Sequence, residues 1–338
     1  MPRPRIRALF AALILSALLA APSRPAVQAR GDDVCEPNDT FQNACYLGPE
    51  ANALGFISAP NDIDAYRIEV LDFLVDAHIE LVDRPGPYRV ELANWQGDTI
   101  ASGPEGTIDI TVTMPGIYYI FVDSPTGAAS DSRPYRLDRR LAYPGSSIPQ
   151  ILYAGAFQSG TDEGQFYSDE TADAYATGGK IIIKMKQGGT PSSPTTAQLF
   201  GTRTTLTDFT MTVDSRNESG GNAGHQLLFR VTDDDNYYYV TIDTLDSQVA
   251  LGKKVNGQVT TIVDWRETDA IDLAGNVNRT SVRAAGDDIR VYVNDELILR
   301  GSDSTFTTGV FGFATIAWGD PPSVSFDNIL ITTPTEGG

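Results

Sequence analysis

The sequence predicts an all-β protein made of two β-sandwich domains, a small one followed by a larger jelly roll. Three observations favour this class. Short segments of alternating apolar and polar residues recur along the chain, separated by turn residues. Few segments show a helical period, and 31 glycines and 20 prolines interrupt the chain. The 338 residues also exceed what one hydrophobic core usually organises, so two domains are expected.

Residues 1–29 are predicted to be a secretory signal peptide. Three arginines lie among the first seven residues, an apolar run covers residues 8–21, and the segment ends in Val-Gln-Ala, a small-residue cleavage pattern. The apolar run is shorter than the roughly 20 residues that span a bilayer, and no later segment is long and apolar enough. The mature chain is therefore expected to be secreted, extracellular or at the cell surface, without a membrane span.

The chain is strongly acidic. Its formal charge is −19, and loss of the four arginines of the signal peptide gives −19 − 4 = −23 for the mature chain. A net field of this sign repels a phosphate backbone, so we expect no nucleic-acid partner.

The two cysteines, Cys35 and Cys45, both lie in the expected mature chain. An even count at such short spacing in an exported protein predicts a disulfide. Zinc is not expected, because neither histidine has a thiol or a second histidine at ligand spacing.

The first domain is expected over residues 30–142. Residues 63–70 alternate between apolar and polar side chains, which is typical of a half-buried strand. Polar or glycine-containing breaks at residues 96–98 and 114–116 divide the later stretches into strand pairs. These strands predict a compact antiparallel sandwich.

This domain carries a family resemblance. The segments EPNDTFQNA, DIDAYRIEV, GIYYIFVDS and PYRLDRR, in this order, resemble the bacterial pre-peptidase C-terminal domain. The resemblance implies a small β-sandwich of the kind appended to secreted enzymes and surface proteins. This chain departs from that setting because no HExxH or GxSxG protease motif accompanies the domain. Asp62 and Asp64 have two interpretations, as calcium ligands or as caps of backbone donors in a turn.

Residues 143–150 read as a linker, rich in proline, glycine and serine, and the second domain is expected over residues 151–334. Phe209, Met211 and Val213 share one face of a strand. Asn-Gly at 256–257 and Asn-Asp at 294–295 predict hairpin turns. About eleven strands and almost no helix predict a two-sheet jelly roll.

The segment QLLFRVTDDDNYYYVTID predicts a hairpin whose loop is TDDDN, because Asp and Asn accept local backbone hydrogen bonds. Strict alternation would place Arg230, Tyr237 and Tyr239 on the sheet face opposite the core, and Tyr292 is out of phase with its core-facing neighbours. Aromatic rings on such a face stack on sugars, and an arginine fork supplies donors to hydroxyl groups. The alternative is that these tyrosines simply favour strands and pack across them.

The second domain also resembles a known fold family. The segments FRVTDDDNYYYVTID, SVRAAGDDIRVYVNDELILRG and VSFDNILI resemble the concanavalin A-like/laminin G-like jelly rolls, and the nearest type is the 3-keto-disaccharide hydrolase. The resemblance implies the fold, which hosts lectins, spacers and glycosidases, and it transfers no catalytic residue to this chain.

No catalytic residue is predicted. Glycoside hydrolysis usually requires two carboxylates at a set separation, and the E-x-D-x-x-E run of glycoside hydrolase family 16 does not occur in the sequence. Asp327, in SFDNI, is expected to hold a bend of the last strand or a structural ion. Calcium at Asp62, Asp64 or Asp327 is the one cofactor that the sequence suggests.

Three functions remain from the sequence. The favoured one is a secreted bacterial non-catalytic protein that binds a polysaccharide or cell-surface glycan through the jelly roll. The alternatives are a structural or adhesive envelope protein and a glycoside hydrolase of the 3-keto-disaccharide type.

Overall fold

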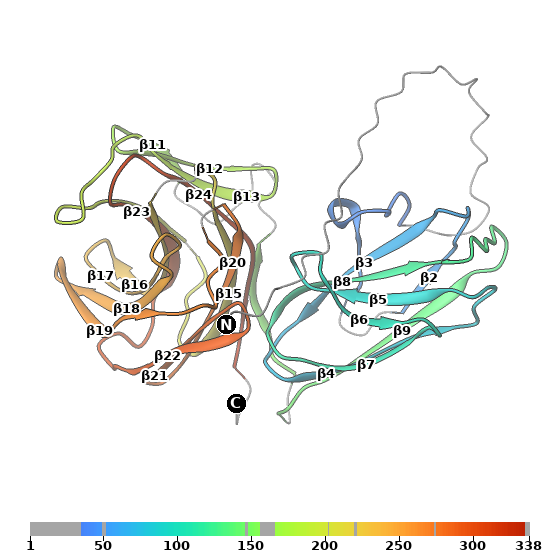
Figure 1. Cartoon of the computed structure of the whole chain (residues 1–338). Coiled ribbons are helices and arrows are strands. Elements are labelled where there is room, and N and C mark those ends of the chain that lie inside the picture. Colours follow the sequence, from blue (N-terminus) through green and yellow to red (C-terminus); the bar gives the residue numbers. More distant parts are fainter. Residues whose placement is uncertain are drawn as a thin grey trace, which may run out of the picture.

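The structure is a computed structural model that describes residues 35–48, 52–145, 148–155, 166–201, 203–219, 222–273 and 275–334. These residues form strands and one short 3₁₀ turn, η1 (Phe41–Asn43), so the expected all-β class is confirmed. The strands build two β-sandwiches that lie side by side in Figure 1. The predicted signal peptide lies outside the described residues. Among the described residues, no helix has the length and hydropathy that a membrane span requires.

The N-terminal sandwich consists of a five-stranded and a four-stranded sheet. All pairs are antiparallel except β1 with β3. The five-stranded sheet has the order β1 (Cys45–Tyr46), β3 (Ile63–Val70), β8 (Gly116–Asp123), β5 (Arg89–Ala93), β6 (Thr99–Gly103). The four-stranded sheet has the order β2 (Ala53–Gly55), β9 (Tyr135–Ala142), β4 (Val75–Val82), β7 (Thr107–Val112). The predicted Cys35–Cys45 disulfide is present.

The C-terminal sandwich consists of a nine-stranded and a six-stranded sheet. The nine-stranded sheet has the order β11 (Tyr167–Ser168), β12 (Ala172–Thr177), β13 (Lys180–Met185), β24 (Ser323–Thr332), β15 (Phe209–Asn217), β20 (Val277–Ala285), β21 (Asp288–Val293), β22 (Glu296–Ser302), with β10 (Ile151–Gly155) paired to β24. The six-stranded sheet has the order β14 (Thr195–Phe200), β23 (Val310–Ala317), β16 (Ala223–Asp233), β17 (Asn236–Asp243), β18 (Gln248–Val255), β19 (Gln258–Glu267).

Each sandwich has its own hydrophobic core. The predicted alternation places Phe209, Met211 and Val213 in the core of the C-terminal sandwich, where they are fully buried. The segment that was predicted to be a linker separates β9 from β10, and its described residues form no strand.

The predicted hairpin turns are also found. Asn256 and Gly257 both have positive φ, 49° and 79°, which matches the type I′ turn that joins β18 to β19. Asn294 and Asp295 do the same between β21 and β22, with φ values of 45° and 75°.

Arg230 departs from the expected alternation. Its φ is 48°, and the pairing of β16 with β17 shifts register between Phe229 and Asp233, so a β-bulge rotates Arg230 away from the outward position. Val231 takes that position instead. The side chain of Arg230 is 1% exposed and donates to the backbone carbonyls of Thr207, Gly286 and Phe306 at 2.7–3.1 Å. The prediction that Arg230 lies on a ligand-binding face is therefore wrong, because the bulge makes it a structural residue.

The two sandwiches are docked through the outward face of the nine-stranded sheet. Arg279 on β20 forms an ion pair with Asp214 on β15, with Nε and Oδ1 2.8 Å apart, and both side chains are buried. The guanidinium lies over the rings of Trp95 and Tyr118 from the N-terminal sandwich, 4.8 and 5.7 Å from the ring centroids. Tyr292 packs on Phe73 with ring centroids 4.4 Å apart.

Tyr292 therefore lies at the contact between the sandwiches. It cannot join a ligand-binding face with Tyr237 and Tyr239, because β21 belongs to the other sheet. The outward phase predicted for Tyr292 is right, but the two sheets have separate outward faces.

Candidate functional site

The site is built on the side of the six-stranded sheet that faces away from the core, which we call the outer face. On β17, Tyr238, Val240 and Ile242 enter the core, so Tyr237 and Tyr239 point to the outer face. This placement of Tyr237 and Tyr239 agrees with the sequence-based prediction. Their role in binding a ligand stays a prediction.

One end of the outer face carries two tryptophans that sequence reasoning missed. Trp265 comes from β19 and Trp318 directly follows β23, and their ring centroids lie 6.1 Å apart at an interplanar angle of 70°. In a flat sheet, four ladder spacings of about 4.8 Å would separate β23 from β19. The ring contact therefore requires the sheet to curl toward its outer face, which makes this face concave. Trp265 remains 46% exposed.

A glycine makes room for the tryptophan pair. A Cβ on Gly224 would lie 2.7 Å from Trp318 and 3.2 Å from Thr241. Next to Gly224 on the same face, the Gln226 amide donates to the Thr241 hydroxyl at 2.7 Å, and both side chains are buried. The tryptophan end therefore combines exposed aromatic surface with a polar floor.

Asp243 and Glu267 flank the tryptophan end. Both are partnered by Gln248 across the ladder, so they lie at the same level of the sheet, two strands apart. Asp243 accepts from the backbone N–H groups of Leu245 and Asp246 at 2.9 and 3.1 Å, and burial raises its pKa. A partly buried carboxyl group thus borders the aromatic surface.

The opposite end of the outer face lies near the β16–β17 hairpin, and we call it the hairpin end. Tyr237 is 5% exposed, packs against Phe200 with ring centroids 6.3 Å apart, and accepts a hydrogen bond from the Gln198 amide. Burial raises the pKa of Tyr237 to about 12. Tyr239 extends across Gly252, where its hydroxyl occupies the space that a Cβ would need. Tyr239 is partly exposed, so of this pair it presents more surface to solvent.

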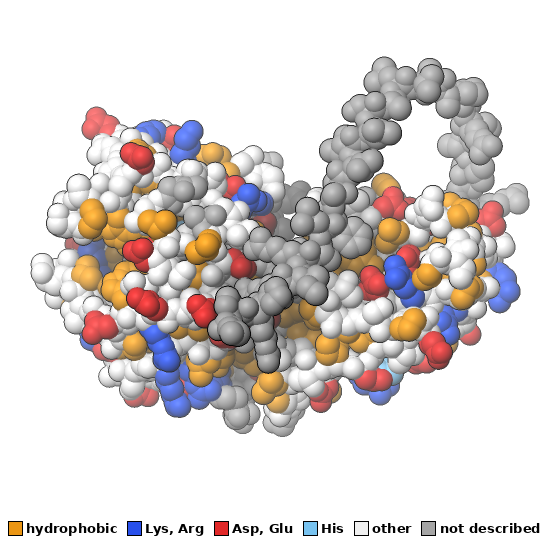
Figure 2. Space-filling view, viewed as in Figure 1, with side chains coloured by type: hydrophobic (Ala, Val, Ile, Leu, Met, Phe, Trp, Pro, Cys, Tyr) orange, Lys and Arg blue, Asp and Glu red, His pale blue; other side chains and the backbone are white. Residues whose placement is uncertain are grey.

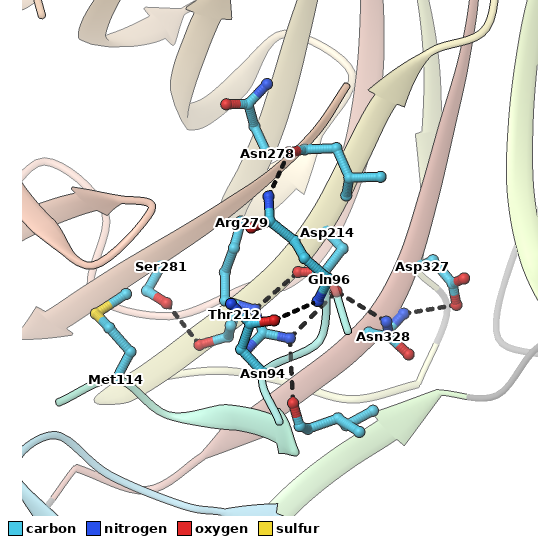
Figure 3. Close-up of polar contacts among 12 residues, drawn as sticks. Asn94, Gln96, Met114, Thr212, Asp214, Asn278, Arg279, Ser281, Asp327 and Asn328 are labelled. Carbon is cyan, nitrogen blue, oxygen red and sulfur yellow. Dashed lines mark hydrogen bonds and ion pairs between the residues drawn. The ribbon is translucent and has the colours of Figure 1, made fainter. Parts of the chain in front are cut away.

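Asp327 lies apart from the outer face. Figure 3 shows it beside Asn328, Asp214 and Arg279 in the network at the contact between the sandwiches. Its carboxylate accepts from the Asn328 N–H at 2.7 Å, Asn328 has a φ of 51°, and the β15–β24 pairing shifts register here. This geometry favours the bend interpretation over the ion. Burial raises the pKa of Asp327.

Asp62 and Asp64 lie in the N-terminal sandwich together with Glu36. One carboxylate oxygen from each of the three lies within 4.8 Å of the others. Asp62 also caps a turn, accepting from the Ser58 N–H at 2.5 Å and from its hydroxyl at 2.8 Å. The two interpretations of Asp62 are therefore compatible, since a carboxylate has two oxygens.

Asn38 lies next to this carboxylate group. Its N–H donates to Glu36 Oε2 at 3.3 Å, its carbonyl accepts from Ala65, and its side-chain amide is fully buried. No hydrogen-bond partner for that amide occurs within the described part of the chain. Carboxylate and amide oxygens are the ligand types that calcium prefers.

If calcium binds here, the unfolding temperature should rise with calcium concentration, because a ligand specific to the folded state adds about 2.7 kcal/mol at a hundredfold excess over Kd. Differential scanning calorimetry in calcium and in chelator measures this, with the Asp62→Asn variant expected to lose the response. Asp327→Asn is the control and should keep it. Equal unfolding temperatures in calcium and in chelator would show that this site does not bind calcium.

The surface charge agrees with the acidic composition. In the view of Figure 2, acidic side chains are spread over both sandwiches. At the hairpin end, Lys254 lies over the Tyr237 ring, 5.6 Å from its centroid, and its charge is paired with Asp235 at 2.8 Å.

A family model described as the 3-keto-alpha-glucoside-1,2-lyase-like domain matches residues 158–332, which is more than half of the chain. No curated protein matches at a significant level.

Two solved structures are among those similar to this chain. A carbohydrate-binding module from Bacillus subtilis is 24% identical, covers 50% of this chain and 99% of its own, and has a TM-score of 0.40. The laminarinase catalytic domain from Thermotoga maritima is 12% identical, covers 56% of this chain and 100% of its own, and has a TM-score of 0.42. Because the sequence identities and TM-scores are low, the ligands and substrates of those two proteins are not assigned to this chain.

Proposed function

The chain belongs to the family of 3-keto-alpha-glucoside-1,2-lyase-like domains, and on this premise we propose that it is a secreted, non-catalytic protein that binds a polysaccharide or cell-surface glycan. The ligand lies on the outer face of the six-stranded sheet and engages the tryptophan end first. Trp265, Tyr239 and Trp318 supply the aromatic surface.

The observation that carries this proposal is the tryptophan pair. An indole ring that is 46% exposed, braced by a second indole 6.1 Å away, is an apolar plate held in one orientation. The C–H faces of sugar rings stack on such plates, and hydroxyl groups at the ring edge need polar partners. Asp243, Gln248 and Glu267 border the plate and provide acceptors and donors for them.

Replacing Trp265 by alanine is expected to weaken glycan binding by at least about thirtyfold, because truncating a tryptophan that anchors a ligand costs about 2 kcal/mol or more. A glycan array with the mature protein identifies the ligand, and calorimetry on that glycan measures the loss.

Tyr175→Ala serves as the control, since Tyr175 is an exposed aromatic on β12 of the other sheet. Its affinity should equal that of the unaltered protein. Full binding by Trp265→Ala would place the site elsewhere, and no binding to any glycan would favour the structural or adhesive function.

A catalytic function has one observation in its favour. Asp243 has a raised pKa, as a proton donor in glycoside hydrolysis requires, and Glu267 lies two ladder spacings away, about 10 Å between Cα atoms. Against it, Asp243 already accepts two backbone hydrogen bonds in a turn. Release of sugar from a 3-keto-α-glucoside, abolished in Asp243→Asn, would replace the binding proposal with this one.

The N-terminal sandwich is proposed to be a pre-peptidase C-terminal-like module that accompanies the sugar-binding sandwich out of the cell. The Cys35–Cys45 disulfide supports export, because such bonds persist in oxidising compartments. The fate of residues 1–29 is measured by N-terminal sequencing of the protein recovered from culture medium.

A further inference from the structure

The hairpin end of the outer face opens into a pocket of about 290 Å³. We call it the hairpin pocket. Phe200, Gln198 and Thr196 line it from β14, Tyr167 and Asp169 line it from the β11 side, and Asp234 lines it from the tip of the β16–β17 hairpin. Three separate segments of the C-terminal sandwich therefore converge on it.

The pocket walls are held in place by hydrogen bonds among the lining residues and to their neighbours. Tyr167 is hydrogen-bonded to the backbone of Gln198, whose side-chain amide donates to Tyr237. The Asp169 carboxylate accepts from the N–H groups of Thr171 and Ala172 at 2.7 and 2.9 Å. A ligand would meet these groups already oriented, which lowers the entropy lost on binding.

The three adjacent aspartates of the hairpin have three different positions. Asp233 accepts from the Asp235 N–H and from the Asn236 amide, both at 2.8 Å, and so closes the turn. Asp235 pairs with Lys254 at 2.8 Å. Asp234 lines the pocket, and its carboxylate has no hydrogen bond or ion pair to any described residue.

The lining selects the chemistry of the ligand. Asp169 and Asp234 are the charged residues that line the pocket, and Lys186 and Lys254 donate to their backbone carbonyls at 2.7 and 3.0 Å from outside the lining. The opposite charges offset one another, so the pocket favours a ligand without net charge. Phe200 and Tyr167 offer ring surface, while the carboxylates and the Gln198 amide accept and donate hydrogen bonds. Neutral polyhydroxylated rings satisfy both requirements.

The pocket and the tryptophan end lie on different strands of one face. Thr196 lines the pocket on β14 and shares a ladder level, through Ile316 on β23, with Gly224 on β16 beside Trp318. Two ladder spacings, about 10 Å, separate these two strands. One sugar ring does not cover that separation. We propose that the hairpin pocket is a subsite for one neutral sugar unit, and that the ligand of the outer face is an oligosaccharide that reaches both ends. This inference rests on the proposed function.

The test uses malto-, cello- and laminari-oligosaccharides of one to six glucose units, titrated calorimetrically into the whole protein. In the series that binds, affinity should level off once the sugar covers the tryptophan end. It should increase a second time when the oligosaccharide is long enough to enter the pocket. Phe200→Ala and Asp234→Asn should each weaken binding of the six-unit sugar about tenfold and leave the two-unit sugar unaffected. Trp265→Ala should weaken binding of all lengths.

Asp235→Asn is the matched control, because Asp235 is adjacent on the same hairpin and does not line the pocket. It should bind every length as the unaltered protein does. If Trp265→Ala loses binding while Phe200→Ala and Asp234→Asn retain it, the pocket subsite is wrong and the proposed function stands. If no oligosaccharide binds, both are wrong. If the effect of Asp234→Asn disappears in chelator, the pocket holds a cation and the sugar assignment is overturned.

Discussion

Replacing Arg279 by methionine is expected to lower the free energy of unfolding by about 3–5 kcal/mol, the usual cost of breaking a buried ion pair from one side. Asp214 would then be left buried, with the Asn328 amide at 2.8 Å as its remaining neutral partner. The stacking of the guanidinium on Trp95 would be lost as well. Calorimetric unfolding should also separate into two transitions, because Arg279 connects the two sandwiches.

The matched control is Arg290→Met. Arg290 lies on the neighbouring strand β21 and pairs with Asp288 at 2.8 Å at a partly exposed position, so less than about 1 kcal/mol is expected. The double variant Asp214→Asn/Arg279→Met should recover part of the loss, since neither buried charge then remains. An Arg279→Met protein as stable as the unaltered one would refute the role of this ion pair.

Acidification from pH 6.5 to pH 4 is expected to cost about 3 kcal/mol of stability through His225 alone. Burial lowers the pKa of His225 to about 4, whereas an unfolded histidine titrates near 6.5. The unfolded chain therefore takes up a proton in this window that the folded chain does not, and stability falls as the pH falls. About one pH unit above 6.5 and beyond, both states are neutral and the contribution is constant.

The surroundings of His225 explain the shift. Its Nδ1 is 2.9 Å from the Ser215 hydroxyl between the two sheets. Neither its Nε2 nor the hydroxyl of Thr315, its ladder partner, has a hydrogen-bond partner among the described residues. Neither of these two contacts, Ser215 and Thr315, carries a negative charge that would stabilise a protonated ring.

Urea unfolding of the His225→Gln variant measures the effect as the difference in pH dependence from the unaltered protein, which cancels the carboxylates common to both. His78→Gln is the control, because His78 is the only other histidine and lies on the surface. The control should keep the part of the pH dependence that comes from His225. Parallel curves for His225→Gln and the unaltered protein would show that His225 is not responsible.

The alternation of residues predicted most of the fold because each strand has one buried face. It placed Tyr237 and Tyr239 correctly, and it predicted the turns at Asn256 and Asn294, where the local sequence tolerates positive φ. It failed at Arg230, since nothing in LLFRVTD announces a bulge. The compensating residue is Gly309, far away in sequence, where a Cβ would collide with the Arg230 backbone.

The tryptophan pair could not be predicted for a different reason. Trp265 lies on β19 and Trp318 directly follows β23, four positions away in the sheet, and the curl of that sheet brings their rings together. The alternation of nearby residues predicts which face of the sheet a side chain lies on. The curvature of the sheet depends on all its strands, so the local sequence does not predict it. The available signal was composition alone, since the chain has only three tryptophans.

The docking of the two sandwiches determines how the outer face is displayed. The N-terminal sandwich covers the nine-stranded sheet, and the six-stranded sheet lies on the far side of the C-terminal core (Figure 1). A chain held to a surface by its N-terminal sandwich would therefore present its concave face outward at a fixed height and angle. Neighbouring molecules in such a layer would offer their faces in parallel, and a long polymer could be captured by several at once with high avidity.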